Sequence, residues 1–257
     1  MANIIADSTV STGQATLSGL AGDDTYEIAS ATAIILKNSN EGTDTVRTAL
    51  ATYSLAAIAN VENLTGTMPG PYGQNLSGNG LNNIITASSV NAFGSGAVLS
   101  GLDGNDTLFG FNYDDALYGG VGDDSMVGGF GSDSYIVDSI YDEVVELDGE
   151  GIDFIRTELA VYFLPSGVEY LNFNEGSTAH IGYGNALENL SRAVTVTTRS
   201  TAARATIRST AVPTLRAATR PTSRTPPVRA SRSISRSQAH RSSAAVSGRI
   251  RCRASRT

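Results

Sequence analysis

The chain has 257 residues, among them 27 glycines, only 7% aromatic residues and no tryptophan, a composition that suits turns and thin strands rather than a thick core. Its formal net charge of −7 conceals two opposite parts, since all 25 acidic residues precede Leu190 and 15 of the 18 basic residues follow it. The first part therefore carries −22 and the second +15. The single cysteine, Cys252, excludes an intramolecular disulfide, so stability outside a cell would have to come from a metal ion.

Residues 1–18 form an N-terminal segment without a recognisable targeting signal. Met1 to Leu20 lacks the basic start and the apolar stretch of a secretory signal peptide. No run of eighteen apolar residues occurs in the chain, so the sequence predicts no membrane-spanning helix.

The next unit, residues 19–100, begins with an isolated nonapeptide and continues as short predicted strands. The nonapeptide is GLAGDDTYE, with Asp24 at its sixth position and Tyr26 at its eighth. Apolar or alternating runs at 33–36, 43–47 and 61–64 favour β-strands. The sequence therefore predicts a β-rich spacer after the nonapeptide.

A tandem block, residues 101–136, consists of four nine-residue units in register. The units are GLDGNDTLF, GFNYDDALY, GGVGDDSMV and GGFGSDSYI. Each begins with Gly, carries Asp at its sixth position and has an apolar residue at its eighth: Leu108, Leu117, Met126 and Tyr135. A short fixed period indicates a stacked repeat. Glycines suit a tight turn, and the last three residues of a unit can form a short strand whose middle side chain points inward.

Two units complete one flattened coil in this interpretation, so residues eighteen apart lie one above the other. We then expect Asp106 over Asp124, and Asp115 over Asp133, at a strand spacing of about 4.8 Å. Carboxylates held this close repel each other, and such short strands bury little apolar surface to offset the repulsion. A Ca²⁺ ion, which accepts about six to eight oxygens from carboxylates and turn carbonyls, resolves the conflict.

The block resembles the RTX, or hemolysin-type, calcium-binding nonapeptides G-G-x-G-x-D-x-(apolar)-x. Two units match at every fixed position and the first lacks only the second Gly, but GFNYDDALY has Phe111 and Tyr113 where the family has Gly. The resemblance implies an all-β, right-handed parallel β-roll or β-solenoid with Ca²⁺ bound at its turns. The candidate metal ligands are the carboxylates of Asp106, Asp124, Asp115 and Asp133, the carbonyls of Gly104, Asn105, Gly122 and Asp123, and Asp24 of the isolated nonapeptide.

Residues 137–190 repeat the earlier spacer at a period of roughly 107 to 109 residues. EGTDTVRTALATYSL at 41–55 corresponds to EGIDFIRTELAVYFL at 150–164, and GNGLNNI at 78–84 corresponds to GNALENL at 184–190. We call residues 19–84 the first copy and residues 128–190 the second copy. The spacers contain acidic residues that could be read as catalytic pairs, but we expect them to be solvated strand residues: Asp44, Asp153, Glu62 and Glu169. His180, the only histidine before the tail, is expected to be an ordinary strand residue.

The tail, residues 191–257, is rich in Arg, Ser, Thr and Ala, and is predicted to be disordered. Arg199-Ser200-Thr201-Ala202 recurs as Arg208-Ser209-Thr210-Ala211 after nine residues, the period of the tandem block. We therefore interpret the tail as a repeat block translated in the wrong reading frame. With codons that mostly end in G or C, the shifted frame of residues 192–211 encodes two further nonapeptides. The alternative is a native basic arm that binds nucleic acid electrostatically.

The leading functional hypothesis is a non-enzymatic calcium-binding β-roll that folds when it binds Ca²⁺ and serves as a secreted structural or adhesive module. Its expected partners are calcium ions and a cell surface or extracellular matrix, with no specific nucleic acid. The resemblance implies type I secretion from bacteria through a C-terminal signal, which the frame change would have removed. The alternative is the calcium-binding scaffold of a secreted protease, lipase or epimerase whose catalytic part is absent. The chain has no H-E-x-x-H and no G-x-S-x-G motif.

Overall fold

The computed structural model describes residues 2–7, 14–67, 73–89, 95–174, 180–187, 189–192 and 208–209. All of these lie in the first of two compact units, Met1–Pro213. The predictions for the tail, its disorder and its altered reading frame, lie outside the described residues except at 191–192 and 208–209.

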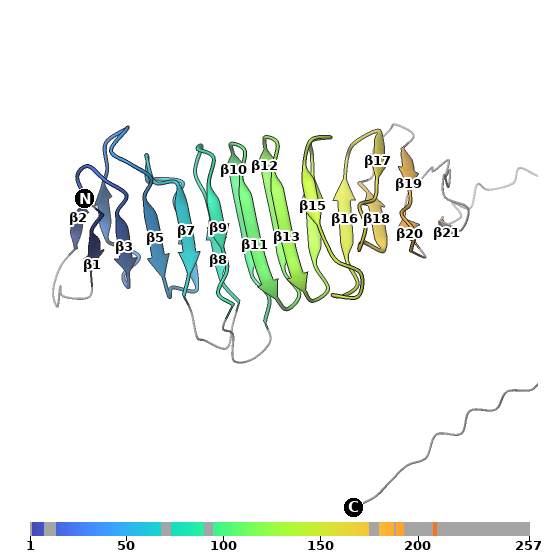
Figure 1. Ribbon diagram of the computed structural model, residues 1–257, viewed down its shortest axis with the longest axis horizontal. Coiled ribbons are helices and arrows are strands. Elements are labelled where there is room, and N and C mark those ends of the chain that lie inside the picture. Colours follow the sequence, from blue (N-terminus) through green and yellow to red (C-terminus); the bar gives the residue numbers. More distant parts are fainter. Residues whose placement is uncertain are drawn as a thin grey trace, which may run out of the picture. The chain divides into compact units, whose positions relative to one another are not determined.

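The described chain is an all-β solenoid of short parallel strands, which confirms the predicted fold class. One face is an eight-stranded sheet, β1-β3-β5-β7-β9-β11-β13-β15, and the opposite face a nine-stranded sheet, β21-β20-β18-β16-β14-β12-β10-β8-β6 (Figure 1). From β5 to β16 the chain alternates between the two faces. None of the described residues forms a helix long and apolar enough to cross a bilayer.

The strands of the first sheet are β1 (Ile4–Ala6), β3 (Thr25–Ile28), β5 (Thr45–Thr48), β7 (Asn63–Gly66), β9 (Ile84–Thr86), β11 (Thr107–Asn112), β13 (Ser125–Phe130) and β15 (Glu143–Val145). Those of the second are β6 (Thr52–Ser54), β8 (Asn75–Ser77), β10 (Val98–Asp103), β12 (Ala116–Val121), β14 (Ser134–Val137), β16 (Phe154–Thr157), β18 (Tyr170–Phe173), β20 (Leu190–Arg192) and β21 (Arg208–Ser209). Two further pairs are β2 (Thr16–Ser18) with β4 (Ile34–Leu36), and β17 (Val161–Phe163) with β19 (Ile181–Tyr183).

The tandem block advances by eighteen residues per coil, as its spacing predicts. Leu108 of β11 pairs with Met126 of β13, and Leu99 of β10 pairs with Leu117 of β12. The eighth-position side chains point between the two sheets and are fully buried, while their strand neighbours are only partly covered. The core therefore consists of two facing rows of apolar side chains, one from each sheet, which lengthen with each coil.

The second and fourth positions of each nonapeptide adopt the left-handed backbone region. Gly104 has a φ of 119° and Gly122 a φ of 154°, and a Cβ on Gly122 would lie 1.9 Å from the carbonyl oxygen of Gly104 in the coil below. Four residues at these positions are not glycine but still adopt a positive φ: Leu20, Leu102, Phe111 and Tyr113. Such residues cost about 1–2 kcal/mol each.

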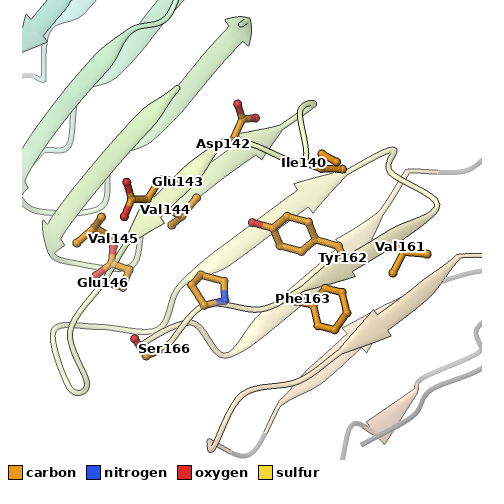
Figure 2. Close-up of a pocket in the computed structure, with 11 residues that line it drawn as sticks. Ile140, Asp142, Glu143, Val144, Val145, Glu146, Val161, Tyr162, Phe163 and Ser166 are labelled. Carbon is orange, nitrogen blue, oxygen red and sulfur yellow. The ribbon is translucent and has the colours of Figure 1, made fainter. Parts of the chain in front are cut away.

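Each copy also contains a break between neighbouring strands on one face of the solenoid. In the second copy an open cleft of about 760 Å³ separates β15 from β17, with Val144 on one side and Tyr162 on the other (Figure 2). A smaller cleft in the first copy is lined by residues of β4 and β6, among them Ile35 and Tyr53. The structure thus reproduces the duplication, including its interruptions.

The strain at the second position is testable at Leu20, which is 69% exposed and has a φ of 63°. Leu20→Gly should stabilise the protein by about 0.5–1 kcal/mol, because relief of the backbone strain exceeds the entropy that glycine loses on folding. Val121→Gly is the matched control: Val121 is 66% exposed and is not among the described residues at positive φ, so it should destabilise. Urea unfolding of both variants measures the difference; equal shifts would contradict the argument.

Candidate metal centre

Acidic side chains form two columns along the edges of the solenoid, one residue per coil. The backbone N–H of Asp106 donates to Oδ1 of Asp124 at 2.8 Å, and the N–H of Asp115 donates to Oδ1 of Asp133 at 2.6 Å. The structure therefore brings together the two pairs that the sequence predicts. Each contact satisfies one buried N–H and one carboxylate oxygen.

The second oxygen of each of these carboxylates is left without a hydrogen-bond partner. Oδ2 is buried and unpaired in all four side chains, whose exposure does not exceed 2%: Asp106, Asp115, Asp124 and Asp133. The glycine that opens each nonapeptide makes room for this oxygen, since a Cβ on Gly101 would lie 2.1 Å from Oδ2 of Asp106, and one on Gly119 would lie 2.3 Å from Oδ2 of Asp124. A buried carboxylate oxygen without a donor is costly unless a cation faces it.

Burial raises the pKa of the aspartate at the sixth position of each nonapeptide in the tandem block. It raises the pKa of Asp106 to about 6, and those of Asp115, Asp124 and Asp133 to about 7, although each accepts a backbone hydrogen bond that acts in the opposite direction. The charge of Asp106 adds to the increase at Asp124, and that of Asp115 adds to the increase at Asp133. The carboxylates of both columns are therefore poorly stabilised in their charged form.

The turns beside these aspartates present backbone oxygens to the next coil. The carbonyl oxygen of Gly104 faces Gly122, and the side-chain oxygen of Asn105 accepts the N–H of Asp123 at 3.1 Å. The four residues proposed as carbonyl ligands thus lie in two stacked turns directly before Asp106 and Asp124 in sequence. The carbonyl of Leu102, which the sequence analysis missed, faces Gly120 in the same way.

A lysine in the first copy shows that a corner of the solenoid, meaning a turn lined by carbonyl oxygens and an aspartate carboxylate, accepts a cation. The Lys37 ammonium donates to the carbonyl oxygens of Leu20, Gly22 and Glu41 at 3.1, 3.5 and 2.9 Å, and lies 2.6 Å from Oδ2 of Asp44. Leu20 and Gly22 are the second and fourth positions of the isolated nonapeptide. Leu102 and Gly104 hold the same positions in the tandem block, and Asp124 then corresponds to Asp44.

The expectation that Asp44 and Asp153 are solvated is wrong, because both are fully buried. Each belongs to an acidic column: the N–H of Asp24 donates to Oδ1 of Asp44, and the N–H of Asp133 to Oδ1 of Asp153, both at 2.8 Å. The spacing of twenty residues, instead of eighteen, concealed this role. Their repeated sequence context, E-G-x-D, was the only signal.

The other two acidic spacer residues, Glu62 and Glu169, are half-buried and extend the columns. They accept the N–H groups of Asp44 and Asp153 respectively, both at 2.8 Å. His180 is buried directly before β19, with Nδ1 3.0 Å from the carbonyl oxygen of Leu159 and its ring stacked on Phe173. None of these contacts indicates a catalytic pair.

The pKa is also raised at three further buried groups near the end of the tandem block: Asp153, Glu146 and Tyr135. Burial raises the pKa of Asp153 to about 6 and that of Glu146 to about 8. Burial, followed by the hydrogen bond to Glu146, raises the pKa of Tyr135, so its hydroxyl stays protonated and donates a hydrogen bond to Oε1 of Glu146.

Comparison with known proteins identifies the tandem block. Residues 98–135 match the family model of the RTX calcium-binding nonapeptide repeat, in four copies. Neither the comparison with curated proteins nor that with solved structures found a match. The family assignment therefore concerns the tandem block, which confirms the resemblance drawn from its residues.

The residues of the block fit a calcium ion. Their ligand atoms are all oxygens, carboxylate and carbonyl, and the four buried Oδ2 atoms lack any other partner. When bound, Ca²⁺ would supply the positive charge that these oxygens lack. The protein's part is to hold the oxygens in stacked turns and to exclude water from them.

The raised pKa values predict an unusual pH dependence for the calcium-free protein. Because the aspartates have folded pKa values of about 6 to 7 against an ordinary 3.8, the folded state binds protons more tightly than the unfolded state. Its stability should therefore fall as the pH rises from about 4 to about 7. Urea unfolding in calcium-free buffer measures this trend. Saturating Ca²⁺ should reverse it, since the ion competes with protons for the same oxygens; stability that rises with pH without calcium would contradict the prediction.

Proposed function

We propose that this protein is a non-enzymatic calcium-binding module whose solenoid is completed by Ca²⁺ ions held between stacked turns. The observation that carries the proposal is the set of buried, unpaired Oδ2 atoms along the tandem block. Asp106 with Asp124, and Asp115 with Asp133, supply the carboxylates. Carbonyls of the adjoining turns supply further oxygens: Leu102, Gly104, Asn105, Gly122 and Asp123.

Calcium then couples directly to folding. An ion that binds only the folded state stabilises it by about 2.7 kcal/mol per site at a hundredfold excess over Kd. Two or three such sites approach the ~5–15 kcal/mol of net stability typical of a domain. Without metal, the part of the chain up to Leu190 carries a charge of −22 and contains several buried carboxylates. It is therefore expected to be weakly folded where Ca²⁺ is scarce and ordered where Ca²⁺ is millimolar.

The expected dependence of folding on calcium supports an extracellular location for the protein. A module that is loose at cytosolic calcium and rigid at extracellular calcium is suited to export in an unfolded state followed by folding on arrival. We therefore propose a secreted structural or adhesive role at a cell surface or in the extracellular matrix.

The central prediction concerns calcium and one aspartate. Calcium should increase the β-sheet circular dichroism and the melting temperature of the full chain, and chelation should reverse both. Asp124→Asn should reduce the calcium response, because it removes a ligand charge, yet stabilise the calcium-free protein at pH 8 by removing a buried anion.

Asp148→Asn is the matched control, since Asp148 is exposed in the turn that follows β15 and lies outside the acidic columns. It should leave both properties unchanged. A β-sheet signal and a melting temperature that are indifferent to calcium would refute the proposed function.

A further inference from the structure

Three buried carboxylates converge in the second copy, and one of them, Asp133, also belongs to the Asp115–Asp133 pair. One oxygen each of Asp133, Glu146 and Asp153 lies within 4.8 Å of the others. The side chains are 0%, 4% and 0% exposed. Asp133 comes from the last nonapeptide, whereas Glu146 follows β15 and Asp153 precedes β16, so the sequence gives no regular spacing that joins them.

Each of the three uses only one of its oxygens in a hydrogen bond. The N–H of Asp115 donates to Asp133, the N–H of Asp133 donates to Asp153, and the hydroxyl of Tyr135 donates to Glu146. The remaining oxygens, Oδ2 of both aspartates and Oε2 of Glu146, are buried without a hydrogen-bond partner. The ion pairs found among the described residues, Lys37–Asp44 and Arg47–Glu27, do not include them.

The duplication supplies an internal comparison for this cluster. Residues 109 positions earlier are Asp24, Lys37 and Asp44, so the first copy has a lysine where the second has Glu146. The surrounding hydrogen bonds correspond. Gly22 N–H donates to the Glu41 carbonyl at 2.6 Å, and Gly131 N–H donates to the Glu150 carbonyl at 3.1 Å. Both copies also place an aspartate N–H 2.8 Å from Oδ1 of the next aspartate.

Lys37 therefore marks the position of a cation in this fold. Its ammonium is surrounded by three carbonyl oxygens and Oδ2 of Asp44, with a side chain only 1% exposed. Although burial acts to lower the pKa of Lys37, the hydrogen bond and charge of Asp44 raise it above its ordinary value, so the side chain remains protonated. The corresponding carbonyls of the second copy belong to Gly129, Gly131 and Glu150.

We propose that Asp133, Glu146 and Asp153 bind a further Ca²⁺ ion at the end of the tandem block, and that Lys37 replaces this ion with its own ammonium in the first copy. The inference rests on the proposed function only for the identity of the metal. The described ligands are all oxygens and include no nitrogen or sulfur, which favours Ca²⁺ over Zn²⁺. In the first copy the Lys37 ammonium pairs with Oδ2 of Asp44, whereas Oδ2 of Asp24, a candidate ligand from the sequence, is buried without a hydrogen-bond partner.

The open cleft beside β15 gives this site a route to solvent. Glu146 is among the residues that line it, together with Asp142 and Glu143 on the same side (Figure 2). Acidic residues at the mouth of a cleft raise the local concentration of cations. The cleft thus leads from solvent toward Glu146, whose unpaired Oε2 is buried.

The test exchanges the two residues in the full chain and counts bound ions by equilibrium dialysis against radioactive calcium. Glu146→Lys should bind one Ca²⁺ fewer than the unmodified protein and should melt at a higher temperature in chelator, because the ammonium neutralises the corner permanently. Lys37→Glu should bind one more. Glu143→Lys, which makes the same charge change at an exposed residue of β15, should leave the number unchanged.

The outcomes separate this inference from the proposed function. If the unmodified protein binds no calcium, the proposed function fails. If it binds calcium and Glu146→Lys binds the same number of ions, only the additional site is refuted. If Glu146→Lys does not fold, the number bound by Lys37→Glu decides: one more ion supports the inference, and an unchanged number overturns it.

Discussion

The structure depends on how a column of buried carboxylates is neutralised. Stacking short coils places an acidic residue at each edge, where its Oδ1 accepts the N–H of the preceding coil. This ladder fixes the register between coils, but it leaves Oδ2 buried and unpaired. Hydrophobic burial offsets little of the cost, because each coil contributes only a few inward side chains. The proposed cation beside each aspartate pair would therefore complete the fold by supplying the missing positive charge.

The chain meets this requirement in two ways, which its duplication allows us to compare. The first copy encodes the cation as Lys37, whereas the second encodes another carboxylate, Glu146, at the same place. In a solenoid each coil contacts chiefly its neighbours, so stability is a sum of local terms. Under the proposed assignment, coils around Lys37 are stable without metal, while coils from the tandem block to Asp153 depend on it. The two copies share a backbone, and the proposal is that they differ in their need for calcium.

Sequence reasoning recovered what is strictly periodic. Gly, Asp and an apolar residue recur every nine positions, and this was enough to derive the eighteen-residue coil, the buried row from Leu108 to Tyr135 and the stacked aspartates. It fails where the period changes: the sequence predicts Asp44 and Asp153 to be solvated strand residues, whereas coils of twenty residues bring both into the buried acidic columns. Alignment of the two copies shows Lys37 opposite Glu146. Only the fold shows that both positions lie among carbonyl and carboxylate oxygens that can bind a cation.

The backbone conformation at the second and fourth positions relates the presence of glycine in a nonapeptide to its expected affinity for calcium. Positive φ is what turns the carbonyls of Leu102 and Gly104 toward the next coil, and glycine adopts it without strain. GFNYDDALY carries Phe111 at φ 81° and Tyr113 at φ 75°, so the corner between Asp115 and Asp133 is assembled at a cost of about 1–2 kcal/mol per residue. That cost is subtracted from the free energy of ion binding. The site at Asp106 and Asp124 contains one such residue, Leu102, and should therefore fill at a lower calcium concentration.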